Sequence, residues 1–140
     1  MPSKNFRWLV PVLFAVALVA CSRDRPPGIE VVLTEADAGA TLTVPTGARI
    51  VVRLASNPST GYGWTEVAPP GPALRALGEP AFEKTDAASR VVGAPGVQVF
   101  RYEVAAPGRA RVVLAYARPW EPADTPAAGR FDVTVVARPR

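Results

Sequence analysis

Four segments of this chain alternate strictly between apolar and polar residues, and this pattern constrains the fold more than any other feature. The segments are 49–55, 97–104, 109–116 and 131–136. In the first of them, Ile50, Val52 and Leu54 share one face, whereas Arg49 and Arg53 lie on the other. Such alternation is typical of antiparallel strands that bury one face.

Weaker strand candidates precede, separate or follow these segments, and proline- or glycine-rich turns lie between them. The weaker candidates are 29–33, 40–44, 64–67 and 81–84. A convincing helical period is lacking, and segment 72–78, "PALRALG", predicts at most one helical turn. The series predicts an all-β domain, an immunoglobulin-like β-sandwich of about seven or eight antiparallel strands.

The first 20 residues have the pattern of a secretory signal. Lys4 and Arg7 precede an uncharged apolar run of 13 residues, 8–20. This run is shorter than the roughly 20 residues that a membrane-spanning helix needs. A retained transmembrane anchor is therefore disfavoured.

The run ends in "LVAC", residues 18–21, which resembles the lipobox of bacterial lipoproteins. The resemblance implies cleavage before Cys21, acylation of that cysteine, and attachment of the chain to a cell-envelope membrane. Ser22 favours the outer membrane in that system. The alternative is an ordinary signal peptide followed by a free cysteine. The predicted organisation is a signal segment, 1–20, an acylated cysteine with a tether, 21–28, and one immunoglobulin-like domain, 29–140.

Composition excludes several kinds of chemistry. The chain has no histidine and one cysteine, which removes Ser-His-Asp and Cys-His nucleophile systems and imidazole-based zinc sites. No set of acidic residues has metal-ligand spacing, and no further acid converges on Glu121 and Asp124 to form a catalytic pair. We therefore expect no enzyme, cofactor or metal site.

Charge gives little support for a nucleic-acid partner. Without Lys4 and Arg7, 14 basic residues face 12 acidic ones, and the formal charge falls from +4 to +2. The arginines between 90 and 130 are scattered singly and form no basic run. We expect a monomer that does not bind nucleic acid.

The stretch "SNPSTGYGW", residues 56–64, is the most unusual connection. Pro58 fixes its own φ and pushes Asn57 into an extended conformation. Gly61 and Gly63 permit positive φ or a close approach of another chain segment. The sequence predicts a pre-shaped, narrow loop with a tip of small residues.

Two further connections resemble contact loops. "VGAPG", 92–96, is a glycine-flanked turn that leads into the strand at 97–104. "ARPWE", 117–121, follows the strand at 109–116, and its proline ends the strand and directs Trp120 outward. Trp64, by contrast, opens a strand and is predicted to lie in the core.

The motifs "NPSTGYGW", "GAPG" and "RPW", in this order, resemble those of chagasin-type inhibitors of papain-like cysteine peptidases, inhibitor family I42. The likeness covers about 29–136. It implies an immunoglobulin-like fold with three loops side by side at one end, the first covering the reactive cysteine of the peptidase while the others clasp its cleft. The residues implied to bind the peptidase are Asn57, Pro58, Ser59, Thr60, Gly61, Tyr62, Gly93, Ala94, Pro95, Gly96, Arg118, Pro119 and Trp120.

Two positions depart from the family pattern. Pro95 stands where the second motif usually has glycine, which stiffens the turn and removes a backbone N–H. Ser59 stands where threonine is common.

Two other function classes stay open from the residues alone. One is a carbohydrate- or peptidoglycan-binding module that uses Tyr62, Trp64 and Trp120 as a stacking platform. The other is a structural immunoglobulin-like lipoprotein without a loop function. The Tyr62 ring is as well suited to folding back on the sandwich as to contacting a partner.

Overall fold

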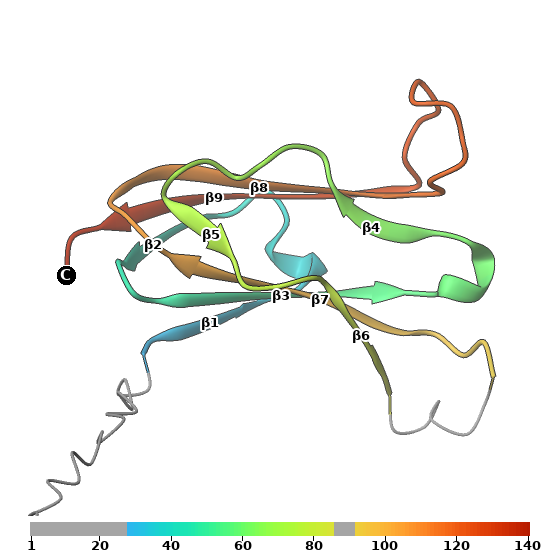
Figure 1. The fold of residues 1–140 in the computed structure, drawn as a ribbon, viewed down its shortest axis with the longest axis horizontal. Helices are drawn as coiled ribbons and strands as arrows, with labels where there is room; N and C mark the ends of the chain where they lie inside the picture. Colours follow the sequence, from blue (N-terminus) through green and yellow to red (C-terminus); the bar gives the residue numbers. More distant parts are fainter. Residues whose placement is uncertain (1–27, 86–91) are drawn as a thin grey trace, which may run out of the picture.

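The computed structural model describes residues 28–85 and 92–140, which form two facing β-sheets (Figure 1). The predicted signal segment, the acylation site Cys21 and all of the tether except Gly28 lie outside these residues. One sheet has the order β1(Glu30–Leu33), β3(Arg49–Ser56), β7(Gly96–Val104) and β5(Leu74–Ala76), and β6(Ala81–Lys84) also pairs with β7. The other sheet has the order β2(Thr41–Pro45), β9(Gly129–Arg138), β8(Gly108–Ala117) and β4(Gly63–Glu66).

The predicted immunoglobulin-like β-sandwich is confirmed, with two differences in detail. The described residues form nine strands rather than seven or eight. Two pairs at the sheet edges, β1 with β3 and β2 with β9, are parallel, and the other pairs are antiparallel. Alternation reports only that a strand buries one face, so it does not reveal the direction of a neighbouring strand.

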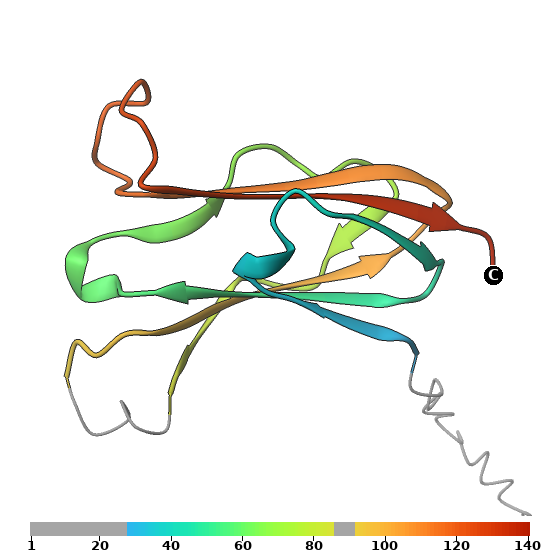
Figure 2. The same cartoon turned by 180° about the vertical axis from the view of Figure 1, so that it is seen from behind.

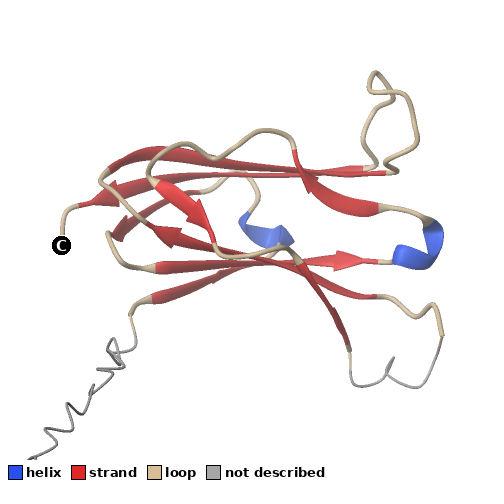
Figure 3. Cartoon of the chain, viewed as in Figure 1, coloured by secondary structure: helices blue, strands red, loops and turns tan. Residues whose placement is uncertain are grey.

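The expectation of a helical turn in 72–78 is wrong, because this segment contains β5. Leu74 pairs with Val104, and Arg75 pairs with Glu103, with which it also forms an ion pair. The edge of β7 offers backbone hydrogen bonds to this segment, and these outweigh its weak local preference for a helical turn. The helical turns of the described residues are two short 3₁₀ turns, Glu35–Asp37 and Pro58–Thr60 (Figure 3).

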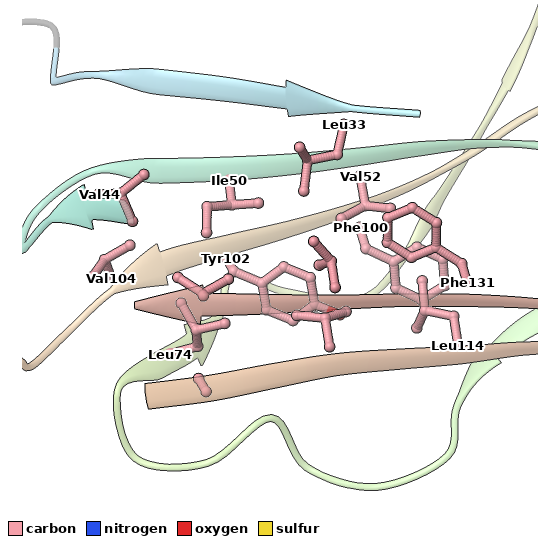
Figure 4. Packing of buried hydrophobic residues seen from close by; sticks show 14 of the residues in the cluster. Leu33, Val44, Ile50, Val52, Leu74, Phe100, Tyr102, Val104, Leu114 and Phe131 are labelled. Atoms are coloured by element: carbon pink, nitrogen blue, oxygen red, sulfur yellow. The ribbon is translucent and has the colours of Figure 1, made fainter. Parts of the chain in front are cut away.

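The core lies between the sheets and consists of the inward side chains that the alternation predicts (Figure 4). Its most buried large members are Tyr102, Phe131, Leu33, Ile50, Leu54, Leu114, Val52, Val104, Val112, Val133 and Val135. Trp64 is also buried, with 7% of its surface exposed, as predicted. Its indole N–H donates to the carbonyl oxygen of Ala55 at 2.9 Å, so the ring fills the core without losing its hydrogen bond.

Charged side chains on the outer faces form ion pairs that the sequence did not predict. Glu103 pairs with Arg75, and Asp132 pairs with Arg111. The Arg111 guanidinium holds the pKa of Asp132 below its usual value, mainly through a side-chain hydrogen bond. Such exposed pairs contribute little to stability.

The connections β3–β4, β6–β7 and β8–β9 lie at one end of the sandwich (Figures 1 and 2). The start of β1 and the C-terminus lie at the opposite end. No helix in residues 28–85 and 92–140 is long and apolar enough to cross a membrane. The described chain therefore begins and ends at the end of the sandwich remote from the three loops.

The buried phenol of Tyr102 should make the protein less stable at alkaline pH. Burial raises the pKa of its phenol well above the usual 10.0, and the hydrogen bond from its hydroxyl to Glu66, at 2.5 Å, acts in the same direction. Below pH 10.0 the Tyr102 hydroxyl keeps its proton in both the folded and the unfolded chain, so the full contribution of this residue to the free energy of unfolding is present. Above that pH the unfolded chain ionises first, and the free energy of unfolding falls by about 1.4 kcal/mol per pH unit from this group.

Urea unfolding of the wild type and of Tyr102→Phe between about pH 8 and pH 11 tests this expectation. The variant should lose less stability than the wild type as the pH rises through the ordinary tyrosine range. Parallel curves for the two proteins would contradict the assignment to Tyr102.

Candidate binding site

The first loop, between β3 and β4, has a rigid tip. Pro58–Thr60 forms one 3₁₀ turn that Gly61 ends in a left-handed conformation, with φ 83°. The backbone N–H of Thr60 donates to the carbonyl of Asn57 at 3.1 Å, and the hydroxyl of Ser59 donates to the Asn57 side chain at 2.6 Å. These bonds fix the turn locally, as proline, asparagine and glycine at these positions favour.

Tyr62 folds back onto the sandwich, which decides the question that the sequence left open. Its ring stacks on Tyr116 of β8, with ring centroids 5.4 Å apart and an angle of 26° between the planes. The Arg118 guanidinium carbon lies 4.2 Å from the centre of the Tyr62 ring. The Tyr116 hydroxyl also accepts a hydrogen bond from the backbone N–H of Asn57 at 3.0 Å, so both ends of the loop meet this tyrosine.

The third loop, between β8 and β9, packs directly against the first. Arg118 Nε donates to the carbonyl oxygen of Thr60 at 3.1 Å, and its Nη1 lies 3.3 Å from the Glu121 carboxylate. Trp120 is 68% exposed, as predicted, yet a ring carbon would lie only 2.2 Å from a Cβ placed on Gly61. The indole therefore covers the bare backbone of Gly61, a contact that only glycine permits.

The second loop, between β6 and β7, lies on the other side of the first. Gly93 has φ 75°, and a Cβ there would lie 3.3 Å from the Ser59 side chain. Gly96 is buried, and a Cβ there would lie 2.5 Å from the carbonyl oxygen of Glu83. Gly96 is thus required by packing within the sandwich, whereas Pro95 is exposed and Ala94 half-buried.

The structure brings all thirteen predicted site residues to this end, but it does not expose them equally. The exposed ones are Pro58, Ser59, Thr60, Gly93, Pro95, Pro119 and Trp120. Together they form a protruding surface, in contrast to the concave pockets in which enzymes hold small substrates. In the described part of the chain, no group of three or more His, Cys, Asp or Glu residues could hold a metal ion.

Two residues that organise the site were not singled out from the sequence. Tyr116 ends the alternating segment 109–116, and its hydroxyl, which needs a partner near the strand end, was the available signal. Gln98 was read only as part of the strand at 97–104, although it is a polar residue at an inward position, beside Phe100 and Tyr102 in the alternation.

A rigid sandwich that presents three mutually packed loops at one end defines a class of binding protein whose partner has a concave surface. Comparison with known proteins narrows the class. Residues 43–135 match the chagasin family of peptidase inhibitors, I42. Chagasin of Trypanosoma cruzi is 37% identical over 93 residues, which are 63% of this chain and 81% of the relative.

Amoebiasin-2 of Entamoeba histolytica is 30% identical over 95 residues, 68% of this chain and 76% of the relative. The crystal structure of the cysteine protease inhibitor EhICP2 from the same organism superimposes with a TM-score of 0.65 at 26% identity, over 81% of this chain and 99% of that one. The chain therefore belongs to the chagasin family, and it is a cysteine peptidase inhibitor of this type.

Substituting Gly61 tests the contact between the first and third loops. In Gly61→Ala the new methyl group must displace the Trp120 indole, in addition to the roughly 1–2 kcal/mol that an alanine pays in the left-handed region. We expect altered chemical shifts of the Trp120 indole N–H and the Thr60 amide in two-dimensional NMR spectra.

Gly39→Ala is the matched control, because Gly39 has the same φ of 83° and nothing lies within 4 Å of an added Cβ. It should lose similar stability and leave the Trp120 signal unchanged. The packing of the indole on Gly61 is refuted if the two variants give the same Trp120 spectrum.

Proposed function

We propose that this protein blocks papain-like cysteine peptidases reversibly by occupying their active-site cleft with the three loops. The tip of the first loop, Pro58–Thr60, is the part expected to lie over the reactive cysteine. The observation that carries this proposal is the packing of the first loop against both of its neighbours, with Gly93 next to Ser59 and Trp120 on Gly61. One ridge of small residues, flanked by two stiff walls, matches a long narrow cleft.

The rigidity of the ridge favours tight binding. Ordering a flexible side chain at an interface costs about 0.5–1.5 kcal/mol, and here the intramolecular contacts have already fixed the loops. Pro58 within a 3₁₀ turn, followed by Gly61 in the left-handed region, also keeps the tip from the extended conformation that cleavage requires. This conformation offers a reason why the bound loop is not cut.

Within the third loop the residues divide between two tasks. Arg118 was expected on a wall of the cleft, but its guanidinium already holds Thr60, Tyr62 and Glu121. Pro119 and Trp120 are exposed and have the shape to contact a peptidase. We assign Trp120 as the main anchor, since tryptophan is enriched among the residues that dominate interface energies.

The lipid attachment at Cys21 and the outer-membrane location are part of the same proposal. The support is the "LVAC" motif with Ser22 after it, together with the start of β1 at the end opposite the loops. A short tether from the membrane would then leave the loops directed away from it. We propose that the protein acts as a monomer, without a cofactor and without enzymatic activity.

The alternative of a glycan-binding module needs exposed stacking faces on Tyr62, Trp64 and Trp120, and two of these three residues do not offer one. Trp64 is buried, and the Tyr62 ring packs on Tyr116 and Arg118, so Trp120 alone among the three proposed aromatic residues is widely exposed. Sugar recognition by stacking needs accessible aromatic faces. The loop arrangement therefore favours a peptidase over a saccharide.

Replacing Trp120 tests the proposed anchor. In titrations of papain with the purified protein, Trp120→Ala should weaken inhibition by about 2 kcal/mol or more, the scale of an interface hot spot. Its melting temperature should stay near that of the wild type, because the indole is largely exposed. Trp64→Ala provides the contrast, and should lose about 3–5 kcal/mol of stability through the cavity it leaves.

Similar stability losses in the two tryptophan variants would contradict this division. Full papain activity in the presence of micromolar wild-type protein would contradict the proposed function.

Replacing Cys21 tests the proposed anchor to the membrane. The wild type, expressed in a bacterium, should incorporate radioactive palmitate and sediment with membranes, whereas Cys21→Ser should do neither. Membrane association that survives the substitution without acylation would instead favour a retained apolar segment.

A further inference from the structure

The side-chain amide of Gln98 lies between the two ends of the first loop. Its Oε1 accepts the backbone N–H of Trp64 at 2.9 Å, and its Nε2 donates to the carbonyl oxygen of the same residue at 2.8 Å. The Ser56 hydroxyl lies 3.5 Å from the same Oε1. Ser56 ends β3 before the loop, and Trp64 lies in β4 just after it.

These bonds join parts of the molecule that no β-ladder joins. β3 belongs to one sheet and β4 to the other, and the first loop crosses the gap between them. Within the described sheets β4 pairs only with β8, and the N–H and carbonyl of Trp64 bond to Gln98 instead of to that partner strand. Gln98 belongs to β7 of the facing sheet, and its amide offers Trp64 the donor and acceptor that a neighbouring strand would supply.

The surroundings make this arrangement costly to lose. Ser56, with 4% of its surface exposed, is the one buried polar residue among those that the structure describes. Trp64 is 7% exposed. Where water is scarce, an unpaired amide or carbonyl costs more than an exposed one. Gln98 lies at an inward position, in the row otherwise occupied by Phe100, Tyr102 and Val104. A polar side chain at this position suits hydrogen bonding to Trp64 better than packing in the apolar core.

We propose that Gln98 is a positioning residue for inhibition. Its amide sets the separation of the two ends of the first loop, and through them the place of the loop tip between its two flanking loops. Because Gln98 follows Gly96 by two residues, the same bonds couple the second loop to the first. This inference rests on the proposed function, since it explains how the inhibitory loop is held.

Two substitutions and one probe enzyme test the proposal. Gln98→Met keeps the approximate shape and removes both polar groups. Against papain, its inhibition constant should rise about tenfold, because the loop must be ordered during binding. In hydrogen-exchange NMR of the unbound protein, the Trp64 amide should exchange at least about tenfold faster, whereas the Val67 amide, bonded to Val113 in the β4–β8 pair, should be unchanged.

Gln98→Glu adds a second readout, the pH dependence of inhibition, which a general loss of stability would not change. At neutral pH its carboxylate accepts from the Trp64 N–H but repels the Trp64 carbonyl. A protonated carboxyl has one donor and one acceptor, like the amide, and burial raises the pKa of a carboxyl above about 4.3. Inhibition by Gln98→Glu, relative to the wild type at each pH, should therefore recover from about tenfold weaker at pH 7.5 to within about threefold at pH 5.

Val135→Ala is the control for stability alone, since Val135 is fully buried in β9 opposite Ala110 and Leu42 and away from the loops. It should lower the melting temperature and leave the inhibition constant unchanged. Unchanged exchange at Trp64 in Gln98→Met, or unchanged inhibition by both Gln98 variants, would overturn the positioning role alone. A wild type that fails to inhibit papain would overturn the proposed function together with it.

Discussion

The inward faces of β3 and β7 pack against those of β8 and β9, and the position of every loop residue depends on this contact. Ile50, Val52 and Leu54 on one side and Val112 and Leu114 on the other are fully shielded from water. The same strands lead into or out of the three loops, since β3 ends at the first, β7 begins after the second, and β8 ends at the third. The buried apolar surface therefore fixes the stems of all three loops at once, and one stable core provides a binding surface whose tip is a short 3₁₀ turn, Pro58–Thr60.

Within that frame the loops hold one another. Arg118 contacts the carbonyl of Thr60 and the ring of Tyr62, and the indole of Trp120 lies on Gly61. These contacts restrict the conformational freedom that a loop of small residues would otherwise have. Absence of a side chain at Gly61 is as necessary to this arrangement as the presence of an arginine at 118.

The strands could be predicted because one buried face forces alternation, whereas the pairing direction and the short β5 could not. A three-residue segment such as Leu74–Ala76 carries no period, and it becomes a strand only because β7 offers it an edge. The different environments of Trp64 and Trp120 were predictable, since one opens an alternating segment and the other follows a proline. The roles of Arg118, Tyr116 and Gln98 depend on which loops become neighbours in space, and local sequence does not contain this information. Two of these residues still carry a signal in the sequence: Gln98 is a polar residue in an apolar row, and Tyr116 has a hydroxyl that needs a partner near the strand end.

The chain enters and leaves the sandwich at the end remote from the three loops (Figures 1 and 2). An affinity handle, a dye or a second copy of the domain fused after Arg140 would thus be separated from the contact surface by the length of the molecule. The fold is consequently suited to immobilisation on beads or sensor chips by its C-terminus, with every molecule presenting the same face to a bulky enzyme in solution.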